Sequence, residues 1–282
     1  MKRQCLVVVL LTGVLLLSLA ACGGPEEKRA KFFERAKGFY EKGDWTKARL
    51  EVKNALQIDP KFAEGYELLG QIEQKEGNLR GAFEAFSRAA ELHPELNAVQ
   101  IELGRLLLMS GAAARALEKA QAVLSRDARH PDGLLLKAAV HLVKKDPEGA
   151  AAVLEPLLAE KGAKPEGYLL LSSAYLQGRH TGKAEKILQD GIAAHPGFVQ
   201  LHLAQAKLFA ETLRPGQAEA ALQKVAALEP NQPLHKFNLA GFMWEQGRQS
   251  AAIDLNASVV AADPPNEGTR EAAARFYVAK KQ

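Results

Sequence analysis

One alanine recurs at an interval of 34 residues along most of this 282-residue chain. It stands at seven positions, which are Ala48, Ala82, Ala116, Ala150, Ala184, Ala218 and Ala252. Internal periods of roughly 20–50 residues are typical of stacked supersecondary units, because one unit is too small to bury its apolar face alone. We call these residues the ladder alanines. Their period predicts a repeat array with an extended binding surface and not a single globular core.

Further positions share this period and divide each unit into two helices. A small residue stands 12 positions before every ladder alanine, and the set is Ala36, Gly70, Gly104, Ala138, Ser172, Ala206 and Ala240. A glycine stands five positions before it in four units, as Gly43, Gly77, Gly111 and Gly247. A proline stands 12 positions after it in five units, as Pro60, Pro94, Pro196, Pro230 and Pro264. Small residues allow close helix packing, glycine permits a tight turn and proline stops a helix, so each unit is predicted to be a helix–turn–helix pair.

The first unit gives expected limits of 29–42 and 45–58 for its two helices, where apolar residues follow a period near 3.6. In the third and fourth units Ala128 and Gly162 replace the closing proline, and Pro131 and Pro165 are expected to supply the stop three residues later. Pro156 lies inside the expected second helix of the fourth unit. It either bends this helix locally or forms a hinge between the first three units and the last three.

The spacing of these residues resembles the tetratricopeptide repeat, whose pattern runs aromatic, Leu, Gly, Ala, Phe, Ala and Pro. The second unit carries it most fully, as Tyr66, Leu69, Gly70, Ala82, Phe86, Ala89 and Pro94. The resemblance implies an all-α fold, an α-solenoid that forms a right-handed superhelix of seven helix–turn–helix units. The expected units are residues 29–62, 63–96, 97–130, 131–164, 165–198, 199–232 and 233–266. Residues 267–282 continue the first-helix phase and are expected to form a capping helix.

The N-terminus has the pattern of an export and anchoring signal. Lys2 and Arg3 precede a 14-residue apolar stretch, residues 6–19, which is short for a membrane span. The stretch ends in Leu-Ala-Ala-Cys, residues 19–22, which resembles the lipobox of bacterial lipoproteins. The resemblance implies a removed signal peptide over residues 1–21, lipidation of Cys22 and a short tether over residues 22–28. The alternative is an ordinary signal peptide that contains a cysteine. Gly23, in place of aspartate, implies the outer membrane, with the array facing the periplasm or displayed at the surface.

In the family that the repeats resemble, the first helix of each pair builds the inner, concave wall. Positions 15 and 8 before the ladder alanine lie two turns apart on one face of that helix, and six of the seven pairs are apolar. The predicted groove residues are Phe33, Tyr40, Ile101, Leu108, Leu135, Leu142, Leu169, Leu176, Leu203, Phe237 and Trp244. Phe237 and Trp244 are expected to be the main anchors for a hydrophobic segment or helix of a protein partner. The alternative is that all these positions are semi-buried packing positions.

The residues between the groove positions test for another kind of binding. They are Lys37, Gln71, Arg105, Ala139, Ser173, Lys207 and Gly241. Some members of the resembled family bind a terminal carboxylate with a clamp of lysine, arginine and asparagine on this wall, and that pattern is missing here. The net charge of +4 is spread along the chain without basic clusters, which argues against a nucleic-acid partner.

The sequence carries no motif for catalysis, a metal site or a cofactor. Its seven histidines are scattered, and it lacks the His-Glu-x-x-His, Cys-x-x-Cys and Gly-x-Ser-x-Gly patterns. His93 and His195 are expected to be solvated, and His141 to be partly buried with its hydrogen bonds satisfied. Glu73 and Asn256 are polar residues at packing positions for which the sequence offers no function. We therefore expect a protein that is not an enzyme.

The sequence predicts a membrane-anchored scaffold that captures a protein and helps to assemble a bacterial envelope complex. Repeat lipoproteins of similar architecture serve secretin and pilus, outer-membrane and exopolysaccharide-export systems. The alternative is an accessory or regulator of a cell-wall or other envelope enzyme. The expected partners are a protein in the groove and the membrane through the lipid anchor.

Overall fold

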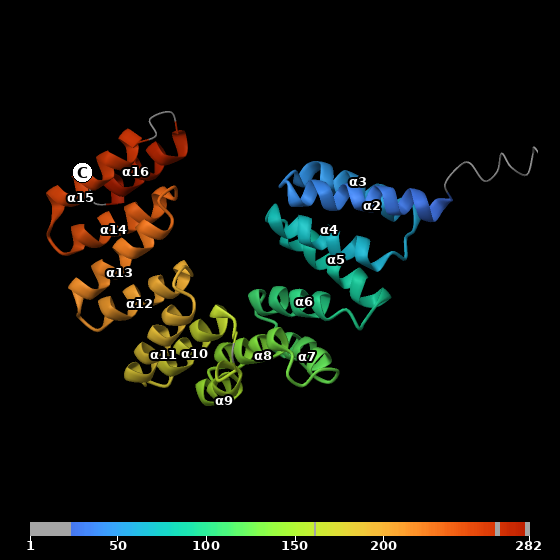
Figure 1. The fold of residues 1–282 in the computed structure, drawn as a ribbon, viewed down its shortest axis with the longest axis horizontal. Coiled ribbons are helices and arrows are strands. Elements are labelled where there is room, and N and C mark those ends of the chain that lie inside the picture. Colours follow the sequence, from blue (N-terminus) through green and yellow to red (C-terminus); the bar gives the residue numbers. More distant parts are fainter. Residues whose placement is uncertain (1–23, 161, 263–265, 280–282) are drawn as a thin grey trace, which may run out of the picture. The chain divides into compact units, whose positions relative to one another are not determined.

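The computed structural model describes residues 24–160, 162–262 and 266–279, which form fifteen α-helices and no strand (Figure 1). The helices form consecutive pairs, which are α2 (Pro25–Glu41) with α3 (Trp45–Ile58), α4 (Ala63–Lys75) with α5 (Leu79–Leu92), α6 (Asn97–Met109) with α7 (Ala113–Leu124), α8 (Pro131–Val143) with α9 (Pro147–Leu158), α10 (Pro165–Gln177) with α11 (Thr181–Ala194), α12 (Val199–Glu211) with α13 (Pro215–Leu228) and α14 (Pro233–Glu245) with α15 (Gln249–Ala262). A last helix, α16 (Glu267–Ala279), follows them. The predicted all-α fold of helix pairs is confirmed.

The chain divides into two compact units, and the division falls inside α8 between Leu136 and Lys137. From here on, the first unit is the part before this division, the second unit is the part after it, and each 34-residue helix pair is called a repeat. Both units follow the same local rule. The two helices of a pair pack on each other, as α2 does on α3 in the first unit and α12 on α13 in the second. The second helix of a pair packs on the first helix of the next pair, as α3 does on α4 and α13 on α14. At the end of the second unit α16 packs on both α14 and α15.

The ladder alanines occupy the tightest packing positions. All seven are fully buried, with 0% of their surface exposed, and the small residues 12 positions earlier are buried as well. Gly70 shows why these positions must be small, because a Cβ built on it would lie 2.6 Å from the Phe86 ring. Phe86 itself is fully buried in a cluster that joins α5 to α6 through Val99 and Leu103.

The turn within each pair has one repeated conformation. Gly43, Gly77, Gly111 and Gly247 adopt φ angles of 74–81°, the left-handed region that glycine tolerates best. In the other three pairs Lys145, Arg179 and Leu213 occupy the same position with φ angles of 61°, 61° and 57°. The turn geometry is therefore common to all seven pairs, although glycine marks it in only four sequences.

Two of the prolines outside the common pattern begin helices, and a third lies inside one. Pro131 and Pro165 are the first residues of α8 and α10, where the absent N–H costs no hydrogen bond. They start the next helix, and the helices before them have already ended at Leu124 and Leu158. Pro156 lies within α9, which remains one helix and ends two residues later. The hinge interpretation of Pro156 stays a prediction.

The N-terminal end of the array differs from the expected limits. α2 begins at Pro25 and not at residue 29, so most of the expected tether is helical. The proposed signal peptide, Cys22 and Pro264 lie outside the described residues. Among the described residues, no helix combines the length and the hydropathy that a bilayer span requires.

Candidate protein-binding surface

The predicted groove residues fall into two classes of exposure. Ile101, Leu135, Leu142 and Phe237 are buried, with 3–8% of their surface exposed. The other seven are half-buried, namely Phe33, Tyr40, Leu108, Leu169, Leu176, Leu203 and Trp244. Side chains that are this enclosed offer a partner little surface, which favours the packing interpretation for these four residues.

The aromatic residues at the start of the wall pack on their neighbours in the first unit. Phe33 meets Phe62 edge to face, with ring centroids 4.7 Å apart, and Tyr40 meets Trp45 at 5.1 Å. Burial, with a smaller contribution from the Glu102 carboxylate, raises the pKa of Tyr40. These rings stabilise the first helix pair and leave only part of their surface for a partner.

The two expected anchors at the end of the wall contact the capping helix. Phe237 is buried with Val259 and with Ala273 of α16. Trp244 meets Phe276 of α16 edge to face, with ring centroids 5.8 Å apart and ring planes at 89°. α16 therefore covers part of the surface of Phe237 and Trp244, which were predicted to anchor a partner.

An open pocket of about 410 Å³ lies between α12 and α14 of the second unit. Its lining residues are Leu203, Ala206, Lys207, Ala210, Leu222, Phe237, Asn238, Gly241, Phe242 and Glu245. The structure thus brings the predicted groove residues Leu203 and Phe237 to one site. We call it the α12–α14 pocket. A Cβ built on Gly241 would meet nothing within 4 Å, so the glycine leaves this wall open.

The charges at the wall are matched by neighbours. Lys207 lies 3.8 Å from Glu211 on the same helix, and Arg105 in the first unit lies 2.7 Å from Glu102 and 3.6 Å from Asp132. Exposed pairs of this kind contribute little to stability, but they reduce the positive potential along the helix. The α12–α14 pocket is lined both by apolar side chains, among them Leu203, Leu222 and Phe242, and by the polar side chains of Lys207, Asn238 and Glu245.

Comparison with known proteins decides which family this is. Two family models, both described as tetratricopeptide repeat, match residues 141–208 and residues 33–97, 101–168 and 203–267. The chain belongs to the tetratricopeptide repeat family. Such repeats mediate protein–protein interaction, which agrees with an open pocket between the first helices α12 and α14.

Individual relatives of this tetratricopeptide repeat chain are distant. The TPR repeat-containing protein PA0015 of Pseudomonas aeruginosa is 34% identical over 56 residues, which are 20% of this chain and 53% of that protein. The chain thus spans about half the length of this curated relative. A tetratricopeptide repeat protein from Parabacteroides merdae has a TM-score of 0.64 at 17% identity, covering 89% of this chain and 99% of its own. PilW, described as a type IV pilus biogenesis factor, has a TM-score of 0.50 at 18% identity, with 86% and 97% covered. These structures show the shared fold.

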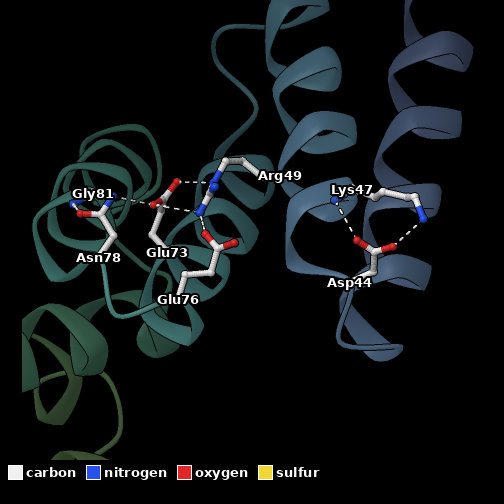
Figure 2. A network of polar contacts seen from close by, with 7 residues as sticks. All are labelled: Asp44, Lys47, Arg49, Glu73, Glu76, Asn78 and Gly81. Carbon is white, nitrogen blue, oxygen red and sulfur yellow. Dashed lines mark hydrogen bonds and ion pairs between the residues drawn. The ribbon is translucent and has the colours of Figure 1, made fainter.

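The polar position at Glu73 has a structural explanation that the sequence did not suggest (Figure 2). Glu73 is 7% exposed, and its carboxylate accepts hydrogen bonds from Arg49 Nε at 2.9 Å and from Asn78 Nδ2 at 2.7 Å. Arg49 also pairs with Glu76. Asn78 in turn accepts a hydrogen bond from the Gly81 N–H and caps α5. Arg49 thus ties the first repeat to the second at a buried carboxylate.

The histidines serve structural contacts. His141 is partly buried, and its Nδ1 lies 2.6 Å from Asp146, as the sequence predicted for a satisfied histidine. His195 was expected to be solvated, and that prediction is wrong, because its Nε2 lies 2.8 Å from the Ala163 carbonyl and its ring lies beside Tyr168. His93, by contrast, is exposed beside Glu95. In the part of the chain that the structure describes, no three His, Cys, Asp or Glu side chains are grouped as a metal site requires.

Asn256 is the other polar residue at a packing position, and it is 1% exposed on α15. Neither its amide nitrogen nor its amide oxygen has a hydrogen-bond partner. Four positions after the ladder alanine the other repeats carry apolar residues, such as Leu154 and Leu188. An unpaired buried amide is costly, so Asn256→Leu is expected to raise the free energy of unfolding by about 1–2 kcal/mol. Chemical denaturation measures this, with Asn256→Asp as a destabilising control. A loss of stability in Asn256→Leu would show that the amide has a favourable role.

Proposed function

We propose that this protein is a lipid-anchored scaffold that captures an apolar segment of a partner protein in assembly of a bacterial envelope complex. The observation that carries the proposal is the combination, in one chain, of a lipobox-like sequence at residues 19–22 and a repeat array with an open pocket that has apolar side chains in its lining. The anchor is Cys22, and the location is the outer membrane with the array facing the periplasm. The fold that the chain shares with the pilus biogenesis factor PilW supports an assembly role.

The α12–α14 pocket is the proposed capture site. Leu203 and Phe242 give it an apolar lining, and Gly241 leaves space in its wall. A large apolar side chain of the partner fits here, because burial of such a side chain stabilises a complex by about 1.5–3 kcal/mol before ordering costs. The seven half-buried wall residues extend the contact within each unit.

Filling the pocket tests the capture site without disturbing the core. Gly241→Phe places a ring where a Cβ meets no atom within 4 Å, and phenylalanine is a better helix former than glycine. We expect at least a tenfold loss of partner binding with unchanged helical circular dichroism. The matched control is Gly216→Phe on α13, which is exposed and also has no atom within 4 Å of a built Cβ. Equal binding by Gly241→Phe and the native chain would remove this pocket from the proposal.

A photocrosslinking residue at position 241 identifies what enters the pocket in living cells. The expected product is a crosslink to a component of an envelope assembly, such as a secretin or a pilus protein, found by mass spectrometry. The same residue at position 216 provides the background. A crosslink confined to a cell-wall enzyme would instead favour the role of an enzyme accessory.

The lipid anchor has its own test. Cells grown with radiolabelled palmitate are expected to label the native protein and not Cys22→Ala, and the native protein is expected to fractionate with the outer membrane. Two or three acyl chains give stable anchoring, so Cys22→Ala is expected in the soluble fraction. Labelling that persists in Cys22→Ala, or its absence from the native protein, would exclude this anchor.

A further inference from the structure

An ion pair recurs at the junction between consecutive repeats. The residue directly after a ladder alanine contacts the following repeat. Its partner lies either at the end of that repeat's first helix or at the N-cap of its second helix. In the first unit Arg49 lies 2.9 Å from Glu73 (Figure 2). In the second unit Glu185 pairs with Arg214 through two hydrogen bonds of 3.0 and 2.9 Å, and Glu219 lies 2.5 Å from Arg248. The charge signs are reversed between the two units, but in each case one member of the pair directly follows a ladder alanine.

The junction between the second and third repeats has apolar residues at these positions. Phe83 takes the place of Arg49, Leu107 that of Glu73, and Ala112 that of the capping Asn78. These side chains cannot form an ion pair, and a cavity of about 470 Å³ opens there. A second cavity of about 220 Å³ shares Phe83, Leu107 and Arg115 with it. We call the two together the α5–α7 groove.

The equivalent junction between the fourth and fifth repeats shows that a missing ion pair alone does not produce an apolar groove. Ala151 and Tyr175 stand there, and the cavity measures about 270 Å³. The Tyr175 hydroxyl donates a hydrogen bond of 2.8 Å to Glu155, and Lys183 Nζ lies 5.4 Å from the centre of its ring. Burial, followed by this hydrogen bond, raises the pKa of Tyr175 to about 12. Polar groups of the chain itself therefore occupy this junction.

Large apolar residues remain exposed at the α5–α7 groove. Leu79 and Met109 on its rim are 44% and 70% exposed, whereas Leu106 and Leu107 beneath them are buried. Flexible Met side chains adapt to varied apolar partners. Contiguous exposed apolar residues around a hollow are typical of an interaction surface, because a partner removes them from water.

The rim of the groove is basic. Arg80, Arg115 and Lys119 line it, and the one acidic residue in the lining, Glu91, lies 2.9 Å from Arg88. Arg80 is paired with Glu84 at 2.9 Å, so Arg115 and Lys119 carry the basic character of the rim. The Arg115 guanidinium lies 6.0 Å from the centre of the Phe83 ring. Within the described residues neither Arg115 nor Lys119 forms an ion pair. We propose that the α5–α7 groove docks an amphipathic helical segment of a partner protein that places large apolar side chains in the groove and carboxylates beside Arg115 and Lys119.

A peptide library displayed on phage tests this partner chemistry with the full-length chain. Sixteen-residue helical peptides with randomised faces are selected on the native protein and counter-selected on Met109→Glu. We expect the enriched peptides to combine Leu, Ile, Phe or Met at i and i+4 with Asp or Glu on the flanks. Enrichment of basic peptides, or no enrichment beyond the counter-selected protein, would overturn the proposal.

Binding of one enriched peptide, measured by fluorescence anisotropy, then assigns it to the groove. Met109→Glu and Arg115→Glu are each expected to weaken binding at least tenfold, and replacement of the peptide carboxylates by lysine is expected to abolish it. The matched control is Leu213→Glu, an 89% exposed residue of the second unit, which is expected to change affinity less than twofold. Equal weakening by all three variants would overturn the assignment. So would self-association of the native chain, or its binding to phosphatidylglycerol vesicles, that disappears in Arg115→Glu and competes with the peptide.

Discussion

Phe86→Ala is expected to lower the free energy of unfolding by about 3–5 kcal/mol, the range for removing a large aromatic side chain from a core. Phe86 is among the largest side chains that are fully enclosed, and it packs with Ala82, Val99 and Leu103. Its ring therefore joins α4 and α5 of the second repeat to α6 of the third repeat. Its removal leaves a cavity that the surrounding side chains fill only in part. Urea denaturation followed by circular dichroism measures the loss, and hydrogen exchange should locate the weakened protection in α4–α6.

Gly70 on α4 faces the Phe86 ring, and its substitution tests how closely α4 and α5 approach each other. Gly70→Ala is expected to destabilise by about 1–3 kcal/mol, because the new Cβ would lie 2.6 Å from a rigid ring. Gly38→Ala on α2 is the matched control, since a Cβ there meets nothing within 4 Å, and it is expected to stabilise by about 0.5–1 kcal/mol.

The double variant Gly70→Ala with Phe86→Leu is expected to lose less unfolding free energy than the two single variants lose together, because the smaller Leu side chain makes room for the new methyl group. Strictly additive losses, or equal effects at Gly70 and Gly38, would contradict the close approach of α4 and α5.

The fold could be predicted because its packing repeats. Each ladder alanine and the small residue before it meet the same environment seven times, so the sequence records that environment as a period. The turn position could be identified in four repeats from glycine alone. In the others Lys145, Arg179 and Leu213 adopt the same conformation, imposed by the helices on either side and not by local preference.

The candidate site could be predicted only in part, because exposure depends on contacts that do not repeat. Leu203 and Phe237 were identified from their position, and the structure places both at the α12–α14 pocket. The period could not show that α16 covers Trp244 and Phe237, since the contact belongs to one end of the array. Leu222 and Phe242 were not among the predicted site residues, because they lie outside the two wall positions considered.

The junction ion pairs did leave a signal in the sequence. Glu185 and Arg214 stand 29 residues apart, as do Glu219 and Arg248 one period later. Opposite charges that recur at a fixed offset within a known period indicate contact between repeats. The same offset leads from Arg49 to Asn78, and only the structure shows that Arg49 binds Glu73 and Glu76 beside it.

Arg49→Ala is expected to lower the free energy of unfolding by about 2 kcal/mol, because it leaves the Glu73 carboxylate buried with Asn78 as its remaining partner. This loss is smaller than the loss expected for breaking a fully buried ion pair, because 28% of the Arg49 side chain is exposed. Arg88→Ala is the matched control. Arg88 lies 2.9 Å from Glu91 in the same unit, but both side chains are largely exposed, and the expected loss is below about 0.5 kcal/mol.

The next junction shows how the loss should be reversed. There Phe83 and Leu107 occupy the positions of Arg49 and Glu73, and the fold accepts them. Arg49→Phe with Glu73→Leu removes the buried charge pair together, leaves Glu76 with part of its side chain in solvent and leaves Asn78 to cap α5. Its stability is therefore expected to lie within about 1 kcal/mol of the native chain. Denaturation of the two single variants and the double variant closes a thermodynamic cycle. A double variant whose loss of unfolding free energy equals the sum of the two single losses would contradict this prediction. It would mean that apolar side chains cannot replace the ion pair at the first junction.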